Sequence, residues 1–254
     1  MQADELVKEF SKGIIGWYGF RKNTRALLIA DKNTEELSEL LTQRCGDADI
    51  IVQDCTDEDL LIKACQDLPE KKYDYTVVIG ALEYMKNPAV FLEGVKRLLK
   101  DDGHMLVAAD NRLGIRYFCG DRDPFTGRNF DGIEHYNRIS HLDWQIINGR
   151  CYSGHELKEI FKSAGMTDCK FYSVFPDIRE TQLVYAQNFT PTEDLSARYS
   201  PSYNFPDTVF LEEETLYGDL IRNGMFHSMA NSYLIEYSQK GEFDNVLHAT
   251  LSLD

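Results

Sequence analysis

The sequence lacks the marks of a membrane or exported protein. Its 254 residues contain no run of about 18 uninterrupted apolar residues, which excludes a transmembrane helix. The first ten residues, MQADELVKEF, carry neither the basic region nor the apolar run of a signal peptide. We therefore expect a cytoplasmic protein that does not insert into membranes.

Sequence patterns that bind metal ions are also absent. The six cysteines form no C-x-x-C pair, and the six histidines form no H-x-x-x-H pair. Without such spacing no zinc site is indicated, so we expect no bound metal. In the cytoplasm the cysteines are expected to remain reduced thiols.

Positive charge is scarce. The 27 lysines and arginines are outnumbered by 42 aspartates and glutamates, which gives a formal net charge of −15. Phosphate backbones and anionic lipid surfaces repel such a chain, and no dense basic patch in the sequence offsets this repulsion. Nucleic acid is therefore not an expected partner.

What the sequence does contain is an alternation of apolar runs and amphipathic stretches over its first 110 residues. This alternation predicts an α/β fold, a Rossmann-like, doubly wound and mostly parallel sheet with helices on both faces. Ligands of such sheets bind at the carboxyl ends of the strands. The predicted strands are 25–30, 48–54, 73–80 and 104–110, and the predicted helices are 3–11, one capped by Asn33 or Thr34, one capped by Thr56, and 88–100; a turn is expected over 13–20.

After residue 110 the alternation breaks. Residues 111–150 are rich in glycine, polar residues and aromatics without periodicity, which is typical of a functional loop or lid. We predict a single domain over residues 1–254, with one insertion at 111–150 and a second at 178–226. The remaining predicted elements are a helix capped by Ser153, a strand at 169–176, a helical stretch around 212–223, a strand at 230–238 and a strand-like end at 245–254.

The segment YDYTVVIGALEYMKNPAVFLEGVKRLLKDDGHMLVAADNRLG resembles class I S-adenosylmethionine (SAM)-dependent methyltransferases. Asp74 stands where that family begins its fourth strand. The family's L-E-H-like motif corresponds to Leu82-Glu83-Tyr84, and its LKPGG sequence corresponds to LKDDG at 99–103.

The run from Asn111 to Tyr136 is similar to a narrower group. These are bacterial methyltransferase-like domains associated with glycosyltransferases of surface-polysaccharide pathways. YSGHELKEIFKSAGM and ANSYLIEYS match the later helix and last strand of that group. The resemblance covers roughly residues 14–240 and implies a class I methyltransferase fold, a seven-stranded sheet whose last strand is antiparallel.

The cofactor loop departs from the family pattern. Family members follow the first strand with a G-x-G-x-G loop, because the backbone must approach the methionine end of SAM without a Cβ in the way. This chain instead reads ADKNTEE from Ala30 to Glu36, a degenerate loop without glycine. A side chain forced into a glycine-only conformation costs about 1–2 kcal/mol. Alternatively, the loop follows another path.

The resemblance implies cofactor-binding residues at the strand ends. Asp31 follows the first strand, where an acidic residue meets the cofactor's amine; the alternative is a helix cap. Asp54 ends the predicted second strand, where the family's acidic residue binds the ribose hydroxyls; if this strand corresponds to the family's third, Asp54 instead lies near the adenine. The candidates beside the expected sulfonium are Gly80, Ala81, Leu82 and Glu83, although Gly80 could equally be a strand terminator.

Candidate substrate-binding residues lie near the same strand ends. Tyr84 can present its ring face to the sulfonium cation. Asn111 and Arg112 begin the long loop, where Arg112 or Arg116 can bind a carboxylate or phosphate of a sugar-nucleotide, and Tyr136 follows in the same loop. The alternative for these residues is a solvated turn or an ion pair within an acidic protein.

Transfer of a methyl group to a hydroxyl requires a general base. The densest polar cluster of the chain contains Asp131, Glu134 and His135, which are therefore the candidate catalytic residues. In the alternative interpretation, Asp131 forms a turn and the others brace the lid.

Two functions follow from these observations. The first is a SAM-dependent methyltransferase that acts on a small, carbohydrate-linked acceptor. The second is a catalytically inactive methyltransferase-like domain that serves as an interaction or substrate-binding module, as a homodimer or in a larger glycan-biosynthesis assembly. A Rossmann domain for another nucleotide is disfavoured because G-x-G-x-x-G is absent.

Overall fold

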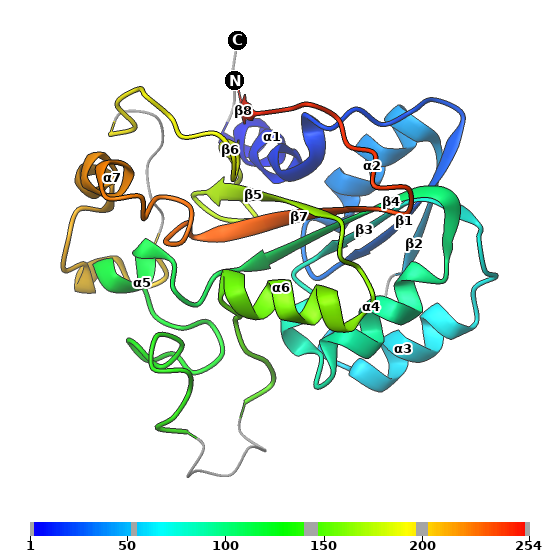
Figure 1. Cartoon of the computed structure of the whole chain (residues 1–254). Coiled ribbons are helices and arrows are strands. Elements are labelled where there is room, and N and C mark those ends of the chain that lie inside the picture. The colour runs from blue at the N-terminus through cyan, green and yellow to red at the C-terminus, as the bar shows by residue number, and fades with distance from the viewer. Residues whose placement is uncertain (1–2, 52–54, 140–146, 197–202, 252–254) are drawn as a thin grey trace.

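Strands and helices alternate along the part of the chain that the computed structural model describes, residues 3–51, 55–139, 147–196 and 203–251 (Figure 1). The strands are β1 (Thr24–Ala30), β2 (Gly46–Ile51), β3 (Tyr73–Ile79), β4 (Leu99–Asp110), β5 (Cys169–Phe175), β6 (Leu183–Ala186), β7 (Ser232–Ser238) and β8 (His248–Thr250). The helices are α1 (Ala3–Gly16), α2 (Thr34–Cys45), α3 (Glu58–Gln66), α4 (Pro88–Lys96), α5 (Ile115–Cys119), α6 (Gly154–Ser163) and α7 (Glu213–Arg222), with 3-10 turns η1 (Leu82–Tyr84) and η3 (Pro206–Thr208).

The strands form one eight-stranded sheet in the order β2-β1-β3-β4-β7-β5-β6-β8. β1 pairs in parallel with β2 and β3, and β3 pairs in parallel with β4. β7 lies between β4 and β5 and is antiparallel to both, so β1 to β5 all run in one direction. The predicted α/β class and antiparallel last strand are confirmed. The expected count of seven strands is wrong. Among the described residues the sheet has eight strands, because β6 and β8 extend it beyond β5 while β2 alone lies outside β1.

Helices cover both faces of the sheet, with α1 and α2 on one face and α3, α4 and α6 on the other (Figure 1). Successive side chains of a strand point to opposite faces. In β1, Leu27 and Ile29 therefore pack into the core beneath α3 and α4, while Ala26 and Leu28 pack into the core beneath α1 and α2. Burial on both faces explains why the parallel strands read as continuous apolar runs.

The helix caps agree with the sequence only in part. Ser153 forms the predicted cap of α6, in a capping box with Glu156. Asp57, not Thr56, caps α3, since its carboxylate accepts a hydrogen bond from the Leu60 N–H at 3.1 Å. Asn33 precedes α2 in a left-handed conformation with φ 54°, but its side chain makes no cap hydrogen bond.

Two predicted boundaries are wrong. α1 continues to Gly16 instead of turning at residue 13, because Ile14 and Ile15 are buried and extend its apolar face. α4 ends at Lys96, and Asp101-Asp102-Gly103 lies within β4. Leu99 pairs with Tyr73, and the pairing of β3 with β4 shifts register immediately afterwards.

Both predicted insertions contain regular structure in their described parts. The 111–150 segment contains α5 and otherwise turns, and it lies at the end of the sheet where α7 also lies (Figure 1). The 178–226 segment contributes β6 to the sheet and then η3 and α7, and β8 forms within the strand-like end. Within the described ranges, none of the helices has the length and hydropathy needed to cross a membrane.

The strand order reverses between β1 and β3. From β1 the chain moves outward to β2 and then crosses back to β3, on the other side of β1. Ligands of open sheets bind at the carboxyl ends of the strands beside such a reversal. Ala30 and Ile79 end these two strands and pair in register, so the residues that follow them lie close together.

The packing of α1 generates a test of the loop after β5. A Cβ added to Gly13 would lie 2.0 Å from the Thr181 carbonyl oxygen, whereas a Cβ added to Gly16 would meet nothing within 4 Å. Gly13→Ala is expected to lower the free energy of unfolding by about 1–3 kcal/mol through overpacking. Gly16→Ala, the control in the same helix, is expected to be neutral or stabilising by up to about 1 kcal/mol. Urea denaturation measures both, and equal effects would contradict the packing.

Candidate functional site

Asp31 and Gly80 follow β1 and β3 and lie against each other at the reversal of strand order. The Asp31 N–H donates to the Ile79 carbonyl at 3.1 Å. A Cβ added to Gly80 would lie 2.4 Å from Asp31 Oδ1, and Gly80 has φ +65°, a conformation that glycine adopts at little cost. The Asp31 carboxylate therefore occupies the space that glycine opens at this strand end.

One arginine connects this pair to the end of β4. Arg179 forms ion pairs through Nη2 with Asp31 Oδ2 at 3.0 Å and through Nη1 with Asp110 Oδ2 at 3.2 Å. The two carboxylate side chains are only 8% and 9% exposed. Burial raises the pKa of Asp31, and the Arg179 guanidinium opposes that rise. Arg179 thus compensates two carboxylates that the strand ends bring together.

The loop that carries Arg179 is fixed from two sides. Asp177 Oδ1 accepts a hydrogen bond from the Arg179 N–H at 2.8 Å, and Asp177 Oδ2 accepts one from Arg116 of α5 at 3.1 Å. On the other side, Asn33 Nδ2 donates to the Arg179 carbonyl at 3.0 Å. The β1–α2 loop and the long loop after β4 therefore both hold Arg179 in place.

Glu83 is a third carboxyl group at this edge of the sheet. It lies in η1 and is 4% exposed, and its Oε1 accepts a hydrogen bond from the Asp110 N–H at 2.9 Å. Burial, and then the nearby Asp110 carboxylate, raise the pKa of Glu83 to about 8. Glu83 is therefore mainly protonated at neutral pH.

A cavity of about 290 Å³ opens beside this cluster, which we call the crevice. Four buried polar atoms of residues that line it have no hydrogen-bond partner in the described structure, namely Asp31 Oδ1, Glu83 Oε2, Arg122 Nε and Arg179 Nε. Two of them belong to carboxyl groups and the other two are guanidinium donors. The crevice can therefore accommodate a ligand that carries both a positive and a negative group.

A larger cavity of about 1120 Å³ adjoins the crevice, and Glu83 and Tyr84 line both. Its walls come from the start of α3, from η1, from residues 147–150 and from α6. Side chains of both charges and two tyrosines line it, so it can hold a polar ligand with several hydrogen-bonding groups.

The predicted cofactor-binding residues are partly brought together. Asp31, Gly80 and Glu83 meet in the crevice. Ala81 and Leu82 are fully buried and pack into the core behind it. Asp54 lies outside the described residues.

The predicted substrate-binding residues occupy different places. The Tyr84 ring lies edge-on to Phe125 between the two cavities. Asn111 is fully buried, and its Nδ2 donates to the Ala230 carbonyl at 2.7 Å, which fastens β4 to the start of β7. The Tyr136 hydroxyl donates to Asp123 Oδ2 at 2.8 Å inside the long loop.

His135 lines the larger cavity, where its Nε2 lies 3.0 Å from Glu156 Oε1. Arg112 and Arg150 also donate to Glu156, at 2.6 and 2.9 Å. Although burial would raise it, hydrogen bonds from Arg112 and Ser153 lower the pKa of Glu156 to about 2. The Glu156 carboxylate can only accept, so a hydrogen bond between the two side chains requires a proton on His135 Nε2, which in the neutral ring leaves the lone pair on Nδ1.

The other two candidate catalytic residues line neither cavity. Asp131 is 1% exposed, and neither of its carboxyl oxygens has a hydrogen-bond partner in the described structure. Glu134 lies at the surface and accepts a hydrogen bond from Arg138 at 2.6 Å. Among the three candidates, only His135 reaches a cavity.

Arg179, Asp110 and Glu156 are site residues that were not predicted from the sequence. Arg179 is 148 residues from Asp31 and lies in a segment without periodicity. Asp110 had a usable signal, because it ends a predicted strand whose neighbour ends at Gly80. Glu156 fits the S-x-x-E pattern of a capping box, which accounts for the glutamate without a site. The pattern therefore gives no indication of its contact with His135.

Comparison with known proteins identifies relatives of this fold. A sequence model of a methyltransferase domain family matches residues 25–169, which run from β1 to the start of β5. A SAM-dependent methyltransferase structure from Archaeoglobus fulgidus is 15% identical, with 93% of this chain and 94% of that one covered and a TM-score of 0.50. A SAM-dependent methyltransferase from Thermotoga maritima is 12% identical, with 92% and 89% covered and a TM-score of 0.45. No curated protein matches the chain.

The contact between Gly80 and Asp31 can be tested with a matched pair of glycines. Gly80 and Gly127 have φ angles of +65° and +66°, but a Cβ at Gly127 would meet nothing within 4 Å. Gly127→Ala is expected to lower the free energy of unfolding by about 1–2 kcal/mol through its conformation alone. Gly80→Ala is expected to cost about 1–3 kcal/mol more, because it also overpacks against Asp31. Chemical denaturation of the two variants measures the difference, and its absence would show that Asp31 does not lie over Gly80.

Glu83 makes stability depend on pH in a defined direction. The native chain keeps the Glu83 proton up to a pH of about 8, whereas the unfolded chain releases it near the ordinary pKa of 4.5. Between these values the native state binds one more proton, so this group lowers the free energy of unfolding by about 1.4 kcal/mol for each unit of rising pH. Glu83→Gln should remove that slope, which urea denaturation from pH 5 to 8 would detect. Glu134→Gln at the surface is the control, and identical slopes in Glu83→Gln and the parent would contradict the assignment.

Proposed function

Because the chain belongs to a methyltransferase domain family of the class I SAM-dependent type, we propose that it binds SAM in the crevice and methylates a hydroxyl or amine of a small, carbohydrate-linked acceptor. When bound, SAM supplies an electrophilic methyl group on a sulfonium. The proposal rests on the buried polar atoms of the crevice that have no hydrogen-bond partner in the described structure, because a ligand with both a positive and a negative group could pair with them.

The crevice offers one partner for each charged group at the amino-acid end of SAM. Asp31 Oδ1 would accept from the ammonium, and Arg179 Nε would donate to the carboxylate. These side chains would do what the backbone of the glycine-rich loop does in other family members.

The larger cavity supports the acceptor part of the proposal. Asp57 and Asp59 can accept hydrogen bonds from hydroxyl groups, and Tyr84 and Tyr152 can pack against the apolar face of a sugar ring. Because Glu83 and Tyr84 line both cavities, an acceptor there would lie next to the cofactor.

His135 would act as the general base in that cavity. Its Nδ1 would take the proton of the acceptor hydroxyl, since Nε2 already carries a proton toward Glu156. Arg112 and Arg150 hold the Glu156 carboxylate, and Glu156 in turn fixes the imidazole ring. Asp131 and Glu134 would support the long loop and take no direct part.

Titration calorimetry with SAM and S-adenosylhomocysteine tests the proposal. S-adenosylhomocysteine keeps the amino-acid end and should bind with a Kd below about 100 μM, or roughly −5.5 kcal/mol. Arg179→Lys keeps the positive charge but lacks the Nε donor, so it should weaken that binding at least tenfold. Arg138→Lys, at a surface ion pair, is the control and should leave the affinity unchanged.

Two results would count against the proposal at different levels. A folded parent protein that gives no heat with either nucleoside would overturn SAM binding and favour an inactive interaction or substrate-binding module. Binding that survives Arg179→Lys unchanged would retain SAM but remove Arg179 from its recognition.

A further inference from the structure

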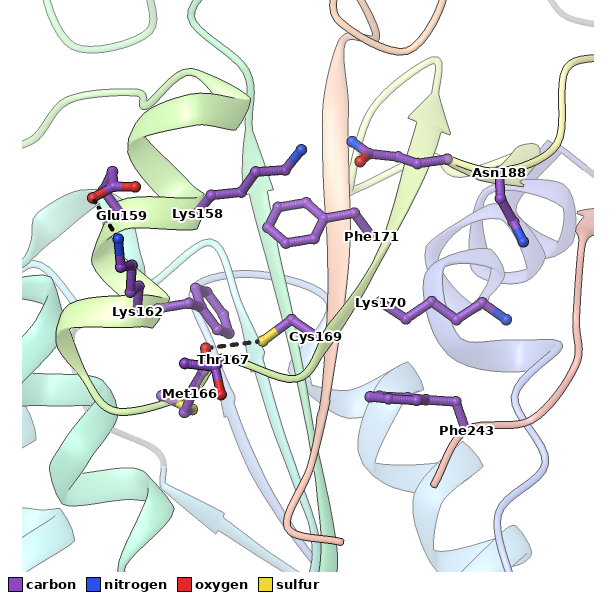
Figure 2. Close-up of a pocket in the computed structure, with 12 residues that line it drawn as sticks. Lys158, Glu159, Lys162, Met166, Thr167, Cys169, Lys170, Phe171, Asn188 and Phe243 are labelled. Carbon is purple, nitrogen blue, oxygen red and sulfur yellow. Dashed lines mark hydrogen bonds and ion pairs between the residues drawn. The ribbon is translucent and has the colours of Figure 1, made fainter. Parts of the chain in front are cut away.

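A separate cavity of about 640 Å³ lies between α6 and β5 (Figure 2). It shares no lining residue with the crevice and one, Glu159, with the larger cavity. β5 runs in the same direction as β4, and the cavity is at its beginning, where Cys169, Lys170 and Phe171 line it. It therefore lies at the amino-terminal ends of the parallel strands, opposite the carboxyl ends where Asp31 and Asp110 lie.

Apolar side chains form much of the wall of this cavity, which we call the lysine pocket. Phe161 and Met166 line it from α6 and the following turn, Phe171 from β5, and Phe243 from the stretch before β8. In Figure 2 the Phe171 ring points toward α6, and Phe243 lies below Lys170. The volume falls in the range of about 300–1,000 Å³ that small-molecule sites occupy.

Three lysines line the same pocket, in a chain whose net charge is −15. Lys158 Nζ lies 5.3 Å from the centre of the Phe171 ring, and Lys170 Nζ donates to the Asp244 and Val246 carbonyls at 2.8 and 2.9 Å. Within the described structure, no carboxylate oxygen lies within 4.0 Å of either amine.

Lys162 is paired only weakly. Its Nζ is 4.0 Å from Glu159 Oε2, with both side chains more than half exposed. Glu159 is also the only carboxylate among the residues that line the pocket. Exposed pairs of this kind contribute little energy, so a ligand could displace Glu159 without a large loss. The pocket therefore combines an apolar wall with uncompensated positive charge.

We propose that the lysine pocket binds an amphipathic organic anion, with an apolar body and a sulfonate, carboxylate or phosphate group. The apolar body packs against Phe171 and Phe243, and the anionic group lies beside Lys158 and Lys162. Lys158 and Lys162 are one helical turn apart on α6, so both amines can reach one anion. Lys170 is held by backbone carbonyls and contributes its charge from the far side.

Two fluorescent probes of nearly equal shape test this assignment. 8-Anilino-1-naphthalenesulfonate carries the anionic group, and N-phenyl-1-naphthylamine lacks it. The sulfonate probe should bind the folded full-length chain with its emission enhanced, and the affinity should fall as salt is raised. Lys158→Glu combined with Lys162→Glu should weaken the sulfonate probe at least tenfold and leave the neutral probe within about twofold.

The control and the contrary results are equally specific. Lys22→Glu combined with Lys63→Glu makes the same charge change at exposed positions that line none of the described cavities. An equal loss in this control would assign the effect to overall charge, and an unchanged affinity in the Lys158/Lys162 variant would overturn the proposal. Displacement of the probe by S-adenosylhomocysteine would place the probe in the crevice and also overturn it. Circular dichroism of each variant confirms that it is folded.

Discussion

The arrangement of the carboxyl ends of the strands depends on one partly buried guanidinium, that of Arg179. The parallel topology places Asp31 and Asp110 at the same edge, where two nearly buried carboxylates would repel each other without a cation between them. Arg179 supplies that cation and contacts both. Because the loop of Arg179 is itself held by Asn33 and by Arg116, the ion pairs connect the first strand, the fourth strand and the long loop into one unit.

This cluster also links the charge of a ligand to the protonation of Glu83. At neutral pH Glu83 retains its proton, since its pKa is about 8. The cluster then contains the Asp31 and Asp110 carboxylates, the Arg179 guanidinium and the uncharged, protonated Glu83. A cation bound in the crevice would favour the ionised form of Glu83 and thus lower its pKa. Binding of a cationic ligand would therefore release a proton, whereas a neutral ligand of the same shape would not.

Local patterns in the sequence were enough to predict the sheet and half of the crevice. Strand ends of a parallel sheet meet at one end of the sheet, and the resemblance to class I methyltransferases assigned Asp31, Gly80 and Glu83 to that end. Arg179 could not, because nothing local marks a loop residue that pairs with a carboxylate 148 positions away. β6 was missed for a related reason, since four residues inside an irregular segment give too little periodicity to recognise.

The structure changes the interpretation of the missing glycines in the loop after β1. An energetic penalty would apply if the loop after β1 kept the family's path and forced side chains into glycine-only conformations. The structure avoids most of that penalty. From Asp31 to Thr34 the only positive φ is at Asn33, and asparagine tolerates that conformation better than most residues. The same Asn33 then uses its amide to hold the Arg179 carbonyl. The loop after β1 therefore supports Arg179. Without glycines the loop backbone does not offer the close approach that the family's loop gives a cofactor, but the Nε donor of Arg179 lies in the crevice beside the loop.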